Sequence, residues 1–461
     1  MTLEKPLEIM KFGGTSQGSM KQMERIAEQV KAHVDDGNKV MVVISAPSTK
    51  EYRTTDETIK EFERARRGET PRTDEEVFHI QYGYREALGG LKSVRDPMSG
   101  RHVFDELLDL MKKGVISIGE EVVDSYRALL YVTGEVYQAA IVAQLFRNHD
   151  INADWIDFDD KRFPVRVRGD DMYAFPDLDE SQQAASNIDW RERDVYVIPG
   201  FGGISKEKNS EKRQKLLGRG GSDTSAFMCL YATGANRCYI CTDVDGIKTG
   251  PYEGSGLVKT LDVKEASFAG FLKAKLPKPN TVDPLKRTYE KERYPEVRIT
   301  NAMNIGTGTE IVETDLKGEP VKFIGSRHIP AVYHLSGPAY ASVQTALDKI
   351  GVDNYTFGSG GGSVRLMIVD GETIGGRKIK QMVNSGNLRI DSYSRDLCVV
   401  GAVGNMRVVI GISSRLQAAL ASHGINMVDP CDQSPCLSAV LVEHEYQKQA
   451  TRAVYDEFFG R

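Results

Sequence analysis

The fold is decided by two stretches near the start of the chain, Glu8-Ile-Met-Lys-Phe-Gly-Gly14 and Lys39-Val-Met-Val-Val-Ile-Ser45. The first is typical of a short strand that stops at paired glycines, and the second of an apolar strand buried on both faces of a parallel sheet. Between them, Ser19 and Gln22 predict a helix start, and apolar residues then follow at helical spacing: Met23, Ile26, Ala27, Val30 and Val34. A strand, a helix and a strand within about forty residues predict a βαβ unit.

The same alternation continues along the chain. Residues 51–130 are highly charged and mostly helical in pattern, as expected of solvated helices that pack by one face. Further strands are expected at residues 152–158, 195–198 and 237–242. The sequence therefore predicts an α/β domain with a mostly parallel sheet sandwiched by helices.

Length and composition exclude several classes of protein. A chain of 461 residues is expected to form two or three domains. The formal net charge of −5, from 60 Lys and Arg against 65 Asp and Glu, argues against a nucleic-acid binder, which would usually be basic. The longest apolar runs, such as residues 40–44, are far shorter than a membrane span, and strand-like residues begin almost at once without the core of a signal peptide. We therefore expect a cytoplasmic protein with no nucleic-acid or membrane partner.

The six cysteines are expected to be free thiols rather than a disulfide framework. Cys238 and Cys241 have C-x-x-C spacing, but they fall inside an expected strand, which favours packing over metal or redox chemistry. Cys431 and Cys436 have Asp432 beside them and no His partner, and we expect a surface loop there. No metal-ligating residue is predicted.

The first candidate site residues surround a glycine turn, Lys11-Phe-Gly-Gly-Thr-Ser16. Paired glycines after a strand let the backbone approach a ligand closely, and the amides that follow form an anion site. Lys11, just before the glycines, could reach transferring phosphate oxygens as a point charge. Gly-Gly turns after strands are common, so this motif is not specific by itself.

A second glycine turn, Gly218-Arg-Gly-Gly-Ser-Asp223, opens a predicted helix. It is either another anion cradle or a tight turn with a helix cap at Ser222. The fork of Arg219 suits a carboxylate, and Asp223 could hold and orient Lys11. Two anion cradles and a lysine suggest phosphoryl transfer, which needs mainly positioning and charge stabilisation. The chain lacks the Walker, protein-kinase and Rossmann motifs.

Five motifs together resemble those of the aspartate kinases, which have the amino-acid kinase fold. They occur in the family's order: KFGGTS at 11–16, VTGE at 132–135, VIPGFGG at 197–203, LGRGGSD at 217–223 and TDVDGI at 242–247. The resemblance covers the whole chain, including its tail. It implies an amino-acid kinase catalytic domain over residues 1–315.

The resemblance also implies a role for each matching residue. Lys11 would neutralise the γ-phosphate and Asp223 would organise Lys11, as a catalytic pair. Substrate contacts would come from four residues, with Glu135 on the amino group and Arg219 on the α-carboxylate: Thr55, Glu135, Arg219 and Ser222. Phosphate and nucleotide contacts would come from Gly13, Gly14, Thr15, Gly220, Gly221, Thr242, Asp243, Lys248 and Lys275.

The implied reaction transfers the γ-phosphate of ATP to the β-carboxylate of L-aspartate and gives 4-phospho-L-aspartate and ADP. This would be the first step toward amino acids derived from aspartate, such as lysine and threonine. A carboxylate is nucleophilic at neutral pH, so no general base is required. Mg²⁺ would be bound mainly by the nucleotide phosphates.

Two segments depart from the family pattern, both on the nucleotide side. Lys248 stands where the family has a Tyr, and the following residues, 249–252, lack the family's Arg. The family's G-A-K-V-L-H-P run is replaced by Lys273-Ala-Lys-Leu-Pro-Lys-Pro279, which places Lys275 on the nucleotide-binding lysine. The lysines are either a redistribution of charge around the phosphates or a solvated basic loop.

The tail contains an internal repeat of a strand, a glycine and a helix pattern, which resembles ferredoxin-like ACT modules. We expect a degenerate first module at residues 316–390 and a better-formed second module at 391–461. The loop at 404–411 is an inhibitor-loop candidate. The modules would bind lysine or threonine and pair in a homodimer, or serve structural pairing alone.

Two other functions stay open. The fold could act on a different carboxylate or amino acid, since the regions of Thr55 and residues 273–279 diverge from the family. The chain could instead be a non-catalytic amino-acid sensor that has lost the family's Arg and His. The presence of Lys11, Glu135 and Asp223, with Arg219, favours an active kinase.

Overall fold

The computed structural model describes residues 6–460 except 68, 91–119, 170, 207–213, 219, 275–281, 315–318, 349–352, 361 and 371. Two predicted site residues, Arg219 and Lys275, therefore lie outside the described residues. Backbone contacts divide the chain into two units, residues 1–246 with 281–310 and residues 247–280 with 311–461. The domain boundaries expected after residues 315 and 390 stay a prediction.

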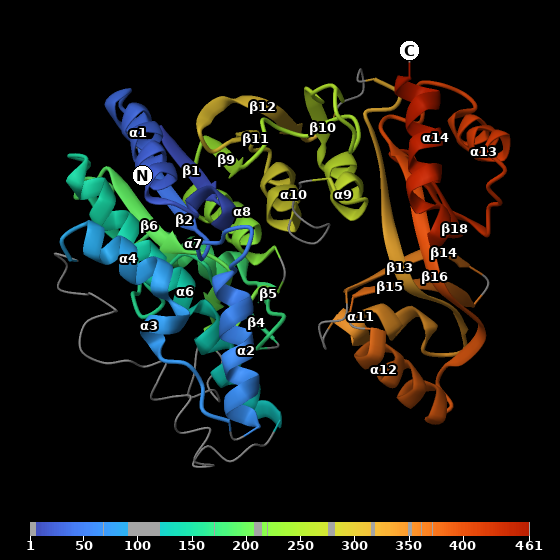
Figure 1. The fold of residues 1–461 in the computed structure, drawn as a ribbon, viewed down its shortest axis with the longest axis horizontal. Helices are drawn as coiled ribbons and strands as arrows, with labels where there is room; N and C mark the ends of the chain where they lie inside the picture. Colours follow the sequence, from blue (N-terminus) through green and yellow to red (C-terminus); the bar gives the residue numbers. More distant parts are fainter. Residues whose placement is uncertain are drawn as a thin grey trace. The chain divides into compact units, whose positions relative to one another are not determined.

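The first unit is built on a sheet whose strands are adjacent in the order β12-β11-β9-β1-β2-β6-β3 (Figure 1). Their bounds are Leu7–Phe12 (β1), Lys39–Ile44 (β2), Ala153–Trp155 (β3), Val195–Pro199 (β6), Arg237–Thr242 (β9), Glu296–Asn301 (β11) and Asn304–Val312 (β12). β1 pairs in parallel with β2 and β9, β2 and β3 with β6, and β9 with β11. This arrangement confirms the predicted strands and the mostly parallel sheet.

Helices pack around this sheet, and two short strand pairs lie beside it. The helices are Met20–Asp35 (α1), Thr54–Arg66 (α2), Asp74–Val77 (α3), His79–Ala87 (α4), Glu120–Asn148 (α6), Leu178–Ala185 (α7), Gly221–Thr233 (α8) and Asp283–Glu290 (α10). The short pairs are Val167–Arg168 (β4) with Phe175–Pro176 (β5), and Gly202–Ile204 (β7) with Gln214–Leu216 (β8). The inner strand β6 is buried along its whole length, as is typical of an inner strand of a parallel sheet.

The first helix begins where the sequence predicts. The Ser19 side chain caps α1 by accepting a hydrogen bond from the Gln22 N–H, and the predicted apolar face is buried, with only Val34 partly exposed. Helix α6 contains a stretch, Ala128–Asn148, that is long and apolar enough to cross a membrane by length and composition. Because 83% of that stretch is buried inside the fold, it has the burial of a core helix.

The second unit contains an antiparallel sheet with the strand order β14-β15-β13-β16-β18-β17. Its strands are Phe323–Ser336 (β13), Asp353–Gly360 (β14), Ser363–Asp370 (β15), Arg389–Val403 (β16), Asp429–Ser434 (β17) and Leu437–Glu443 (β18). Its helices are Val263–Phe271 (α9), Val343–Asp348 (α11), Glu372–Asn384 (α12), Ile412–Ser422 (α13) and Gln447–Phe459 (α14). The described part of the tail thus has the strands and helices of two ACT-like modules (Figure 1).

The long strands β13 and β16 are shared between two hydrophobic cores. Ile324, early in β13, packs with α13, α14 and β18 in one core. Tyr333 and Leu335, late in β13, pack with α11, α12 and β15 in the other. Two modules therefore lie end to end on one pair of strands, an arrangement that a repeat in the sequence does not reveal.

Residues 247–280 pack with the tail through a polar anchor and an aromatic anchor. The Glu265 Oε2 and Lys322 Nζ atoms are 2.8 Å apart, and both side chains are buried. The Tyr455 hydroxyl lies 2.9 Å from Ser255 Oγ, and its ring fills the space in which Gly250 would carry a side chain. These contacts are why this segment belongs to the second unit.

All six cysteines are described and are free thiols, as predicted. Burial in β9 raises the pKa of both Cys238 and Cys241, which agrees with a packing role. The expectation of a surface loop at Cys431 and Cys436 is wrong, because β17 and β18 form a hairpin that buries both side chains.

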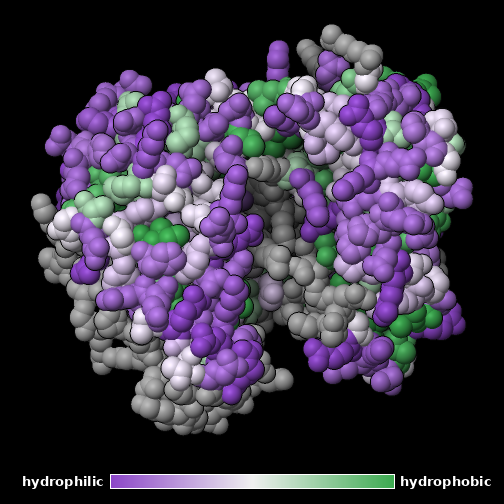
Figure 2. All heavy atoms as spheres, in the orientation of Figure 1, coloured by the Kyte–Doolittle hydropathy of each residue, from purple (hydrophilic) through white to green (hydrophobic). Residues whose placement is uncertain are grey.

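Polar side chains dominate the visible surface of the protein, with small separate hydrophobic patches (Figure 2).

Candidate active site

The candidate site lies at one edge of the parallel sheet, where strands β1, β2, β6 and β9 all end. Ligands of open α/β sheets characteristically bind at the carboxyl ends of such strands. Hydrogen bonds tie the strand ends together: the Ser45 N–H donates to the Phe12 carbonyl at 3.2 Å, and the Gly200 N–H donates to the Ile44 carbonyl at 2.8 Å. The predicted motifs at residues 11–16 and 197–203 are therefore neighbours.

Lys11 and Asp223 form an ion pair at this edge. The Lys11 Nζ and Asp223 Oδ1 atoms are 2.7 Å apart, and the two side chains are 11% and 16% exposed. Lys11 lies near the end of β1, and Asp223 lies in the first turn of α8. The structure thus brings together the two residues that the sequence assigned to a catalytic pair.

The first glycine turn packs tightly against the loop that follows β2. A Cβ atom on Gly14 would lie 2.3 Å from the Ala46 carbonyl oxygen and 2.9 Å from Ser48 Oγ, so no side chain fits there. Beyond it, Thr15 belongs to a short 3₁₀ turn, Gly14–Gln17. The Gly13 N–H donates a long hydrogen bond of 3.4 Å to the Cys241 carbonyl of β9.

The second glycine turn leads directly into helix α8. Gly218 and Gly220 have φ angles of +70° and +83°, in the left-handed region that favours glycine. Gly220 is the N-cap and the helix begins at Gly221, so the alternative of a cap at Ser222 is wrong. Ser222 is instead buried in the first turn, where its Oγ lies 2.9 Å from the position a Cβ on Gly200 would take. The Lys11–Asp223 ion pair places this helix start beside Lys11.

Glu135 is a buried carboxylate in the middle of α6, with 3% of its surface exposed. The Ala46 N–H donates a hydrogen bond to it, but burial dominates and raises its pKa to about 8. Among the described residues, its Oε2 atom has no hydrogen-bond partner. A cationic group of a ligand would supply the missing interaction.

The start of helix α2 closes the site beside Glu135. The Thr54 hydroxyl donates to the Pro47 carbonyl at 2.8 Å, and its methyl group packs against Gly134. The predicted residue, Thr55, follows it in the first turn of α2 and is partly exposed. The loop of Ala46, Pro47 and Ser48 was not predicted as part of the site. Its position directly after an apolar parallel strand was the signal available in the sequence.

The predicted nucleotide residues are more dispersed. Thr242 ends β9, and its Oγ1 accepts a hydrogen bond of 3.2 Å from the Val244 N–H. Asp243 follows and is exposed, and Lys248 is an exposed residue of the second unit. In the part of the chain that the structure describes, no group of three or more His, Cys, Asp or Glu is placed to hold a metal ion.

Comparison with known proteins agrees with this geometry. The model of the Amino acid kinase family matches residues 6–288. The chain belongs to the amino acid kinase family. Within this family it is 24% identical over 98% of its length to an aspartate kinase of Pseudomonas fluorescens, covering 97% of that protein. It is also 22% identical over 98% of its length to a bifunctional aspartokinase/homoserine dehydrogenase of Buchnera aphidicola, of which it spans 56%.

The fold is also that of a solved amino acid kinase. E. coli aspartokinase III, crystallised with aspartate and ADP, superposes with a TM-score of 0.75 at 21% identity. The match covers 98% of this chain and the whole of that one. The amino-acid kinase fold followed by ACT-like modules is therefore confirmed.

Proposed function

We propose that this protein is an aspartate kinase, which transfers the γ-phosphate of ATP to the β-carboxylate of L-aspartate. The observation that carries the proposal is the Lys11–Asp223 ion pair, which lies between two glycine turns at the end of the parallel sheet. The relatives named aspartate kinase and the aspartokinase structure with aspartate and ADP support the choice of substrates.

In the proposed reaction, a β-carboxylate oxygen of aspartate forms a bond to the γ-phosphorus, and the bond from that phosphorus to the β–γ bridging oxygen breaks. ADP leaves with the electron pair of the broken bond, and 4-phospho-L-aspartate forms. Lys11 stabilises the charge on the transferring oxygens, and Asp223 positions the Lys11 ammonium. The amides of the two glycine turns contribute further donors to the phosphates.

The substrate amino group is proposed to bind Glu135. Aspartate binding would bring an ammonium to the Oε2 atom, and the carboxylate of Glu135 would then ionise. Arg219 would bind the α-carboxylate, with Thr55 and Ser222 beside it. Recognition of the substrate therefore requires both its ammonium and its α-carboxylate.

The remaining predictions belong to the same proposal. Mg²⁺ fits as an ion carried by the nucleotide phosphates, because the carboxylate nearest to Lys11 is already paired with it. Lys248 and Lys275 stay predicted contacts of the nucleotide. The proposal also includes a homodimer, regulation by lysine or threonine through the ACT-like modules, and a cytoplasmic location.

The proposal is tested by measuring ADP release with ATP and Mg²⁺ in the presence of L-aspartate. Hydroxylamine, which converts acyl phosphates into hydroxamates, should trap the product, and other amino and acyl acids should give much slower turnover. Faster turnover with another acid would change the substrate. ATP binding without phosphoryl transfer to any acid would favour the sensor instead.

A further inference from the structure

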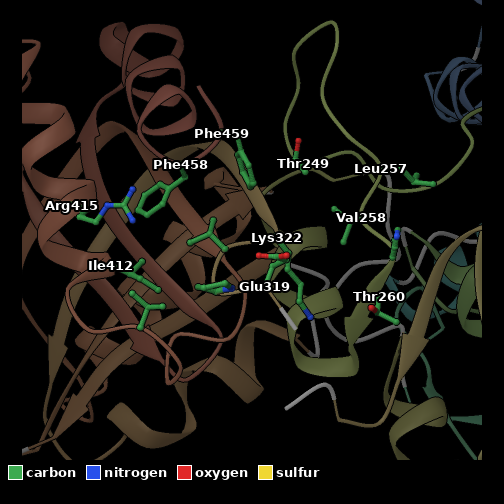
Figure 3. A pocket seen from close by; sticks show the side chains of 14 residues that line it. Thr249, Leu257, Val258, Thr260, Glu319, Lys322, Ile412, Arg415, Phe458 and Phe459 are labelled. Atoms are coloured by element: carbon green, nitrogen blue, oxygen red, sulfur yellow. The ribbon is translucent and has the colours of Figure 1, made fainter. Parts of the chain in front are cut away.

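A cavity of about 700 Å³ lies within the second unit, and no function described above uses it. Its lining comes from the segment 249–260, from residues 319–322, and from helices α13 and α14 (Figure 3). Its volume is in the range of small-molecule sites, roughly 300 to 1,000 Å³. The cavity is therefore large enough for a metabolite.

About half of the cavity wall is apolar, and the rest is polar or charged. Val258, Val321 and Ile412 are buried, and Phe458 and Phe459 are partly buried. Figure 3 shows Ile412 and Phe458 on one side of the space and Val258 on the other. An aromatic or branched aliphatic group could be enclosed between these two sides.

Charged groups at the cavity divide into paired and unpaired ones. Arg415 pairs with Glu457 at 2.7 Å, and Lys322 pairs with Glu265 at 2.8 Å. In contrast, Lys259 and Glu319 are exposed, line the cavity, and have no ion-pair partner among the residues that the structure describes. One cation and one anion are thus available to a ligand.

We propose that this cavity binds a free amino acid with a large apolar side chain. Lys259 binds the carboxylate, Glu319 binds the ammonium, and the side chain packs against Ile412, Phe458 and Phe459. The occupant is expected to carry both charges because one free cation and one free anion line the same cavity. This site is separate from Glu135, which would bind the amino group of the phosphoryl acceptor.

The affinity expected from this arrangement is modest. Burial of the side chain supplies most of the binding free energy. Each contact to an exposed charge tightens binding by only a few-fold. We therefore expect a dissociation constant on the order of 1 mM, which suits a metabolite sensor.

Calorimetric titration of the full chain with three related probes tests the proposal. L-Phenylalanine carries both charges, 3-phenylpropionate lacks the ammonium, and 2-phenylethylamine lacks the carboxylate. L-Phenylalanine should bind at least threefold more tightly than either. Lys259→Met should abolish its advantage over 2-phenylethylamine, and Glu319→Gln should abolish its advantage over 3-phenylpropionate.

Two controls keep the test specific. Lys264→Met removes an exposed lysine of α9 that does not line the cavity, and it should leave all three affinities unchanged. Saturating L-aspartate should not compete with L-phenylalanine. Because both substituted cavity residues are exposed, thermal unfolding midpoints should stay within a few degrees of the unmodified chain.

Three results would overturn the inference: no binding of L-phenylalanine at 10 mM, equal binding by both cavity variants and the unmodified chain, or displacement by L-aspartate. The last would place the ligand at the candidate active site. The titration requires neither ATP nor turnover, so its failure would leave the proposed kinase activity untouched. A protein that shows no kinase activity but binds the three probes in the expected order would contradict the proposed function and support the cavity site.

Discussion

Two buried carboxylates, one in each unit, differ in whether a cation pairs with them. Glu135 in α6 and Glu265 in α9 are 3% and 0% exposed, and burial raises the pKa of both. Each has one carboxylate oxygen without a hydrogen-bond partner among the described residues. Glu265 has its own cation, because Lys322 Nζ lies 2.8 Å away, whereas no described cation pairs with Glu135.

We interpret this difference as one between a structural ion pair, at Glu265, and a proposed ligand-binding group, at Glu135. Glu265 and Lys322 hold residues 247–280 to the tail, and their charges compensate one another. Glu135 lies at the sheet edge beside the loop after β2, where a ligand can supply the compensating charge. A buried acid therefore indicates a ligand site when the fold leaves it without a cation.

The largest effect is expected at the ion pair of the candidate active site, Lys11 and Asp223. Lys11→Ala should lower kcat for ADP release by roughly a thousandfold, since it removes the main positive charge at the transferring phosphate. Because both side chains are partly exposed, the free energy of unfolding should change little. Steady-state kinetics and urea unfolding of the same preparation measure the two effects. A large loss of stability with normal kcat would show that Lys11 has a structural role and not a catalytic one.

The next effect concerns stability rather than activity. Glu265→Gln should lower the free energy of unfolding by about 3 kcal/mol, because it leaves the buried Lys322 ammonium without its carboxylate. Urea unfolding measures this loss. Glu135→Gln is the matched control, and its stability should be unchanged or higher. Equal destabilisation of both variants would contradict the conclusion that only Glu265 stabilises the fold through a paired cation.

Replacing both partners of the structural pair should restore stability. Glu265→Gln combined with Lys322→Met removes the uncompensated charge, so at least half of the loss should be recovered. A double-mutant cycle on urea unfolding gives the coupling energy. Purely additive losses would show that the two charges do not depend on one another.

A separate effect concerns the pH dependence of stability. The folded-state pKa of Glu135 is about 8, above the ordinary value of 4.5, so the folded protein holds a proton that the unfolded chain releases. This group therefore lowers the free energy of unfolding as pH rises from about 4.5 to 8, with no contribution below that window. Glu135→Gln should flatten this slope in unfolding measured across those pH values. An unchanged slope would mean that Glu135 is ionised in the folded protein.

The candidate site could be predicted largely from local patterns. Lys11, the glycine turns and Asp223 each belong to a short motif at a strand end or helix start, and parallel strands bring such ends together. The Ala46 loop was missed because its contribution is a backbone amide, which has no residue signature. The two anchors of the second unit were not predicted for a different reason. Lys322 and Tyr455 contact residues that are 57 and 200 positions away in the sequence, and no local pattern indicates such contacts.

Calorimetric titration of L-aspartate at pH 7, in two buffers of different ionisation enthalpy, tests the role of Glu135 most directly. The unmodified chain should release close to one proton on binding, because the substrate ammonium ionises a group whose pKa is about 8. Glu135→Gln should release none and bind at least tenfold more weakly. Equal affinity and equal proton release in the two proteins would contradict the account.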